Sequence, residues 1–139
     1  MKKIILMAAF VSLGLVQTSC DKDDDKYELP AATLLGKWTY AKEGEVVGGV
    51  EILSDYDGNE EGCSKDYILF NANNTYRAVD FDSFDSPCEE LSETGTYAVT
   101  GNTIALDYGD ETDTAEILNL SYTELKVKSQ DGYIMVFTR

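Results

Sequence analysis

The chain has 139 residues, with 26 acidic residues against 11 basic ones, a formal net charge of −15 and no histidine. A chain this acidic offers no basic face to phosphates or anionic lipid headgroups, so we expect no nucleic acid binding and no electrostatic attachment to a membrane. The lack of histidine excludes Ser-His and Cys-His nucleophile systems, and no other set of residues fills the roles of an active site. We therefore expect neither enzymatic activity nor a cofactor.

The N-terminus has the pattern of an export signal. A basic start is followed by an apolar run from Ile4 to Val16 and by small residues before Cys20. This run is shorter than the roughly 20 apolar residues that a transmembrane helix needs, so we interpret residues 1–19 as a secretory signal peptide. Thr18-Ser19-Cys20 resembles the lipobox of bacterial lipoproteins, which are cleaved before the cysteine and acylated on it. The resemblance implies that Cys20 carries lipid and that the membrane is a partner through this anchor.

A short charged run, Asp21–Lys26, follows the cysteine directly. Such runs are typical of solvated, disordered segments, and we interpret residues 20–33 as the lipidated cysteine and an acidic tether. The run also resembles the export signal of Bacteroidota-type surface lipoproteins. This second resemblance implies a place in the outer membrane, at the cell surface.

The rest of the chain, residues 34–139, has the length of one domain with one packed core. It contains two cysteines, Cys63 and Cys88. An exported protein lies in an oxidising compartment, so we expect these cysteines to form a disulfide. The alternatives are two free buried thiols or a metal site, for which histidine partners are lacking.

Short runs rich in Val, Ile, Thr, Tyr and Phe follow one another along the domain, each closed by Gly, Asn or Asp. They predict nine strands, at residues 37–42, 49–53, 66–71, 75–81, 95–100, 103–108, 114–120, 124–129 and 133–139. No internal helix is indicated. Tight turns between the runs favour an all-β, antiparallel up-and-down meander, which closes into a barrel or folds into a sandwich because an open sheet would expose an edge.

The alternation of side chains sets the expected register. Leu125 and Val127 alternate with Lys126 and Lys128, which predicts that the aliphatic pair faces inward and the lysines outward. The last run, 133–139, is apolar on both faces over its first five residues. We expect that strand to be covered on both sides.

One motif and the order of the runs resemble a known family. Gly36-Lys37-Trp38 is similar to the G-x-W that opens the first strand of lipocalins, and the order of motifs from residue 34 to 139 is similar to the lipocalin-like domains of bacterial lipoproteins. The resemblance implies a calycin-type barrel whose first and last strands pair. In lipocalins the tryptophan packs under an arginine of the final strand, which implies a cation–π contact between Trp38 and Arg139.

Two functions from different classes follow from such a barrel. The first is a non-catalytic binding module for a small apolar or glycan-derived ligand, for which we name ligand-lining candidates that serve equally well as ordinary core: Trp38, Tyr40, Tyr67, Tyr76 and Tyr97. The alternative is a structural or interaction protein, whose filled barrel is a scaffold for partner-binding loops. An interior cavity of at least about 300 Å³ would favour binding.

Two short motifs carry weaker hypotheses. Asp55, Asp57 and Asn59 alternate as calcium ligands do, but the segment departs from the EF-hand because its glycine, Gly58, is at position four and Glu60 occupies position six, where the sharp turn requires glycine. We expect an exposed acidic loop with no metal. Thr114 lies in a three-residue pattern that is similar to the O-glycosylation acceptor of the same bacterial group.

Overall fold

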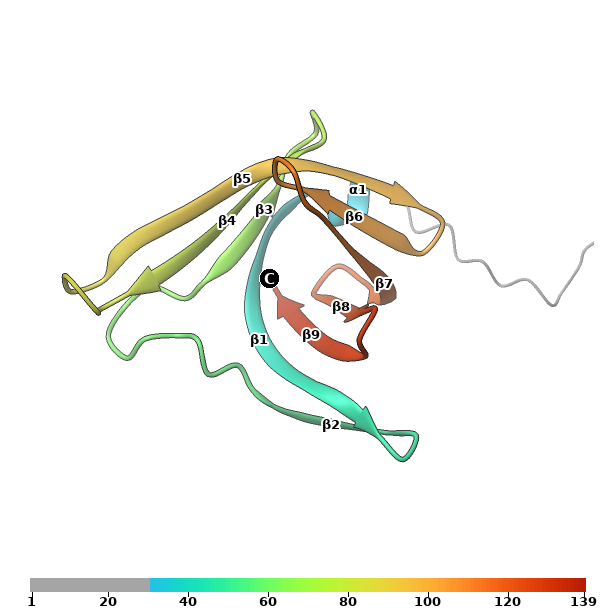
Figure 1. Ribbon diagram of the computed structural model, residues 1–139, viewed down its shortest axis with the longest axis horizontal. Coiled ribbons are helices and arrows are strands. Elements are labelled where there is room, and N and C mark those ends of the chain that lie inside the picture. Colours follow the sequence, from blue (N-terminus) through green and yellow to red (C-terminus); the bar gives the residue numbers. More distant parts are fainter. Residues whose placement is uncertain (1–30) are drawn as a thin grey trace, which may run out of the picture.

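The computed structural model describes residues 31–139. The signal peptide, Cys20 and the acidic run after it lie outside the described residues. One turn of helix, α1 (Ala31–Leu34), precedes nine strands (Figure 1): β1 (Gly36–Val47), β2 (Val50–Asp55), β3 (Tyr67–Phe70), β4 (Thr75–Asp82), β5 (Glu89–Thr100), β6 (Thr103–Asp107), β7 (Thr112–Leu120), β8 (Glu124–Ser129) and β9 (Tyr133–Thr138). The search for membrane-spanning helices in this part of the chain found none of sufficient length and hydropathy.

The strands form one antiparallel meander that closes on itself. From β3 to β9 each strand pairs with the next, β3 pairs with β1, and β9 returns to pair with β1. The closing register places Thr39 opposite Thr138 and Tyr40 opposite Phe137. Eight strands, β1 and β3 to β9, thus make a closed barrel, which confirms the predicted fold class and the pairing of first and last strands.

Strand β1 is shared between three neighbours. Its first residues pair with β3, its last residues pair with β2 along the same edge, and its other edge pairs with β9. The register with β9 shifts between Tyr40 and Lys42, and such a bulge bends a strand. Figure 1 shows β1 curving round β9. Gly44 lies in this bend, where a Cβ would overlap the carbonyl oxygen of Ile52, so only glycine lets β2 come this close.

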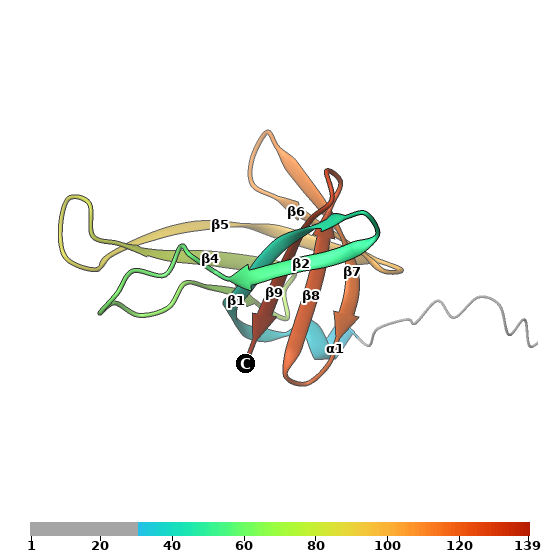
Figure 2. The same cartoon turned by 90° about the horizontal axis from the view of Figure 1, so that it is seen from below.

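The β1–β2 hairpin covers the outer face of the last two strands. Figure 2 shows β2 crossing over β9 and β8, and Lys126 on that face of β8 lies 2.6 Å from Glu51 of β2. Ile134 and Val136 of β9 point to this face and are 0% and 5% exposed. The prediction that β9 is covered on both sides is therefore confirmed.

The predicted register of β8 is also confirmed. Leu125 is buried in the core and Val127 packs against it, both from the inner face. Lys126 and Lys128 point outward and form ion pairs with Glu51 and Glu116. The lysine stems pack along the barrel wall while their charges stay at the surface.

Several predicted strand boundaries were wrong, and one element was missed. Strand β5 begins at Glu89 instead of residue 95, β1 continues to Val47, and α1 adds a helical turn that was not expected. The early half of β5 is rich in glutamate, which has low β-propensity, but its backbone pairs with β4 from Glu89, opposite Asp82, onward. Tertiary pairing overrides the local preference there.

One end of the barrel is closed by core side chains and by Arg139. Trp38 is fully buried beside Leu34, and its Nε1 donates a hydrogen bond to the Leu34 carbonyl oxygen at 2.7 Å. The Arg139 guanidinium carbon lies 4.0 Å from the centre of the Trp38 ring, which confirms the predicted contact. The same guanidinium donates hydrogen bonds of 2.7–2.8 Å to the carbonyl oxygens of Tyr122, Leu35 and Thr33.

Candidate binding cavity

A cavity of about 570 Å³ lies inside the barrel, bounded mainly by strands β6 to β9. Its floor is apolar and continuous with the core. The apolar lining residues are Ile68, Phe70, Ile104, Leu106, Ala115, Leu125, Val127, Met135 and Phe137. This volume lies within the range of small-molecule pockets, and the apolar floor is typical of them.

The mouth of the cavity is polar and lies at the β6–β7 and β8–β9 turns. Figure 2 shows both turns at the end of the barrel opposite α1. Its residues, from the start of β7 and from the β8–β9 turn, are Thr112, Asp113, Thr114, Ser129, Gln130, Asp131 and Tyr133. The Gln130 amide donates a hydrogen bond to the Thr114 hydroxyl, which links the two turns across the mouth.

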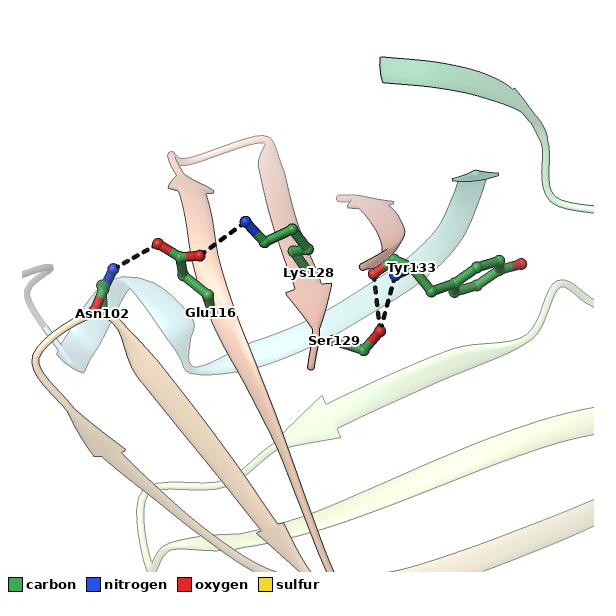
Figure 3. Close-up of polar contacts among 5 residues, drawn as sticks. All are labelled: Asn102, Glu116, Lys128, Ser129 and Tyr133. Atoms are coloured by element: carbon green, nitrogen blue, oxygen red, sulfur yellow. Dashed lines mark hydrogen bonds and ion pairs between the residues drawn. The ribbon is translucent and has the colours of Figure 1, made fainter. Parts of the chain in front are cut away.

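Hydrogen bonds fix the β8–β9 turn. The Ser129 hydroxyl accepts the backbone N–H of Tyr133 at 3.0 Å and lies 3.1 Å from the Tyr133 carbonyl oxygen (Figure 3). It also donates to the Asp131 carboxylate, and this hydrogen bond lowers the pKa of Asp131. Asp131 is therefore ionised at neutral pH.

Two tyrosines hold further carboxylates near the mouth. The Tyr108 hydroxyl donates to Asp113 at 2.9 Å, and the Tyr133 hydroxyl donates to Glu43 at 2.6 Å. These hydrogen bonds, as the largest cause, raise the pKa of each tyrosine to about 12. Both phenols stay protonated at neutral pH, and the mouth is uncharged except for its carboxylates.

The five aromatic ligand-lining candidates occupy other places. Trp38 and Tyr76 are buried in the core, and Tyr40 stacks between Tyr56 and Phe137. Tyr97 packs edge-on against Phe70, while Tyr67 lies under the Lys37 ammonium group. None of the five is among the residues that line the cavity. Their contact with a ligand stays a prediction.

The residues that do line the cavity are mostly small or aliphatic. Ala115 alternates with Thr114 and Glu116, so its inward direction could have been read from the sequence, whereas Met135 lies between Ile134 and Val136 and carries no such signal. Whether four inward-facing strands pack fully or leave a void depends on barrel diameter and on the side chains opposite. Neither is visible in the alternation.

The acidic loop between β2 and β3 is held against the barrel by polar contacts. Asp66 is only 2% exposed, and its carboxylate accepts hydrogen bonds from the Phe81 backbone N–H at 2.9 Å and from the Tyr56 hydroxyl at 3.2 Å. The Asn59 side-chain oxygen accepts the Asp66 N–H, and Asp55 ends β2. Within residues 31–139, no group of three or more His, Cys, Asp or Glu side chains is arranged to hold a metal ion.

A disulfide joins this loop to the β4–β5 turn. Cys63 and Cys88 are bonded with their Cα atoms 5.3 Å apart, which confirms the predicted pairing.

Thr114, the residue in the glycosylation-like pattern, is half-buried in β7 at the cavity mouth, where its hydroxyl accepts the Gln130 hydrogen bond. Its glycosylation stays a prediction.

Comparisons with known proteins agree with this architecture. The model of the family described as a lipocalin-like domain matches residues 34–127. A lipocalin-like protein from Bacteroides uniformis is 15% identical with a TM-score of 0.60, over 77% of this chain and 98% of its own. An uncharacterized protein from Bacteroides eggerthii is 11% identical with a TM-score of 0.58, over 76% of this chain and 98% of its own. The search of curated proteins returned no match.

The two solved structures share the fold at low sequence identity, and the family model covers more than half of the chain. The G-x-W tryptophan of β1 under the arginine that follows β9, together with β1–β9 closure, is the arrangement that the sequence resemblance implied. The chain belongs to the lipocalin-like domain family.

Proposed function

We propose that this protein is a non-catalytic binding module, whose barrel holds a small apolar or glycan-derived molecule. The cavity of about 570 Å³ carries the proposal, because a barrel that acted only as a scaffold would have its interior filled by side chains. The apolar floor would supply the affinity, and the polar mouth would orient the ligand.

The export pattern of the sequence supports a membrane location for this module. We propose that Cys20 is acylated and anchors the protein in the outer membrane, with the barrel at the cell surface. One acyl chain gives only marginal attachment, whereas two or more chains hold a protein firmly. The acidic run behind the cysteine supports surface exposure.

Cavity filling tests the binding function. In Ala115→Phe the phenyl ring should fill part of the cavity. Ligand binding should weaken at least about tenfold, because the ring would take up volume that the ligand needs. Ala98→Phe is the matched control, since Ala98 is exposed on the outer face of β5. Native mass spectrometry of the purified protein would detect a co-purifying molecule. A mass excess that persists in Ala115→Phe would contradict binding in this cavity.

Anchoring is tested separately. Cys20→Ala should move the protein from the outer-membrane fraction to the soluble fraction, and protease added to intact cells should degrade the wild-type protein. Retention of Cys20→Ala in the membrane would contradict the anchor. Protection of the wild-type protein from protease would contradict surface exposure.

A further inference from the structure

The charged side chains that line the cavity are all of one sign. Asp113 and Asp131 stand at the mouth, and no lysine or arginine is among the lining residues. Tyr133 also lies at the mouth, and its hydroxyl donates a hydrogen bond to the Glu43 carboxylate, which is thereby held near the mouth. A polar group that reaches the mouth from the apolar floor therefore meets carboxylates.

The lysines of β8 do not offset this charge because they point away from the cavity and are paired with glutamates. Lys128 precedes the cavity-lining Ser129, yet its ammonium group lies 3.1 Å from Glu116 on the outer wall, where Glu116 also accepts a hydrogen bond from Asn102 (Figure 3). Arg139 is bound at the opposite, closed end of the barrel. The lysines of β8 are thus paired on the outer wall and Arg139 lies at the other end of the barrel, so the lining carboxylates leave the mouth anionic.

We propose, resting on the binding function above, that the ligand is an amphiphile with an amine head group, whose apolar chain enters the cavity and whose ammonium lies between Asp113 and Asp131. The hydroxyl and amide groups of Thr114 and Gln130 at the same mouth can accept further hydrogen bonds from such a head group. Amphiphiles with a carboxylate or phosphate head would meet like charges and bind more weakly.

Binding of a matched series tests the head-group preference. Decylamine, decanol and decanoate share one alkyl chain, so calorimetric titration of the full chain carrying Cys20→Ala, which prevents acylation, isolates the head group. Decylamine should bind tightest and decanoate weakest, with at least about a fivefold difference between these two, since each like-charge contact of about 4 Å costs on the order of 1 kcal/mol even in water. Added salt should reduce the difference because the mouth is open to solvent.

Variants separate this inference from the binding function. Asp113→Asn with Asp131→Asn should bring the affinities for decylamine and decanoate to within about twofold of each other, and Asp85→Asn at the exposed β4–β5 turn should leave their ratio as in the wild-type protein. Equal or tighter binding of decanoate than of decylamine by the wild-type protein would overturn the head-group inference but leave the cavity as a binding site. Failure of all three ligands to bind would overturn both proposals.

Discussion

Arg139 is the residue whose replacement tests barrel closure most directly. Its guanidinium donates to three backbone carbonyl oxygens, which belong to the segment at α1 and to the β7–β8 turn, and it lies over Trp38. We expect Arg139→Gln to loosen the closed end by releasing these segments from one another.

The magnitude follows from the contacts that are lost. Each hydrogen bond contributes about 0.5–1 kcal/mol net at this exposed side chain, and the cation–π contact contributes about 0.5–1 kcal/mol more. The variant should therefore lose about 2–4 kcal/mol of unfolding free energy, which lowers Tm by at least about 8 °C. Arg139→Lys keeps the charge over the ring but not the fork of donors, so we expect about half of this loss.

Urea unfolding followed by circular dichroism measures this loss, and the fluorescence of Trp38, the one tryptophan of the chain, reports on the closed end itself. Arg77→Gln is the matched control, because Arg77 contacts Glu90 and the Ser92 hydroxyl on the outer face, and the Arg77 and Glu90 side chains are more than 40% exposed. That variant should change stability by less than about 0.5 kcal/mol. A loss in Arg139→Gln no larger than the loss in Arg77→Gln would refute the role of Arg139 in closure.

Three further predictions concern the other supports of the fold. Asp66→Ala should cost about 2–4 kcal/mol in thermal or urea unfolding, because the buried Phe81 N–H loses its acceptor, and Asp66→Asn should cost clearly less; equal losses would refute this reading. Replacing both Cys63 and Cys88 by Ala should cost about 3–4 kcal/mol by urea unfolding in the chain-entropy model, and a loss below about 1 kcal/mol would contradict it. Burial raises the Tyr40 pKa to about 12, above the ordinary value of 10. The contribution of the protonated Tyr40 to the free energy of unfolding is therefore complete below pH 10 and is lost as pH rises from 10 to 12. Tyr40→Phe should reduce the fall in stability between pH 9 and pH 11 by roughly 1 kcal/mol, and an unchanged slope would rule out Tyr40 as the titrating group.

The sequence was informative about features that depend on neighbouring residues along one strand, and about pairs for which the domain offers only one possible partner. The alternation around Leu125 predicted the inner and outer faces of β8, and the single pair of cysteines between residues 34 and 139, together with the predicted export, predicted the disulfide. The resemblance of the G-x-W motif led from Trp38 to its contact with Arg139, more than a hundred positions away. The barrel and its closure were thus predictable.

The candidate site was not predictable to the same degree. Aromatic residues suggest a ligand because they bury much surface, but Trp38 and Tyr76 use that surface to fill the core. The cavity lies where small and aliphatic side chains such as Ala115 face one another, and a void of this kind depends on the sum of many side-chain volumes. The sequence placed Asp66 only at the start of a predicted strand, although its carboxylate is a buried anchor for the loop between β2 and β3.

The two ends of the barrel have unequal access to their surroundings. The described chain enters through α1 at the end sealed by Arg139, whereas the cavity opens between the β6–β7 and β8–β9 turns at the far end (Figure 2). A lipid anchor upstream of α1 would therefore hold the sealed end toward the bilayer and direct the opening toward the medium. A barrel in this orientation samples molecules dissolved outside the cell, and bilayer lipids would have to leave the membrane before they could compete for its interior.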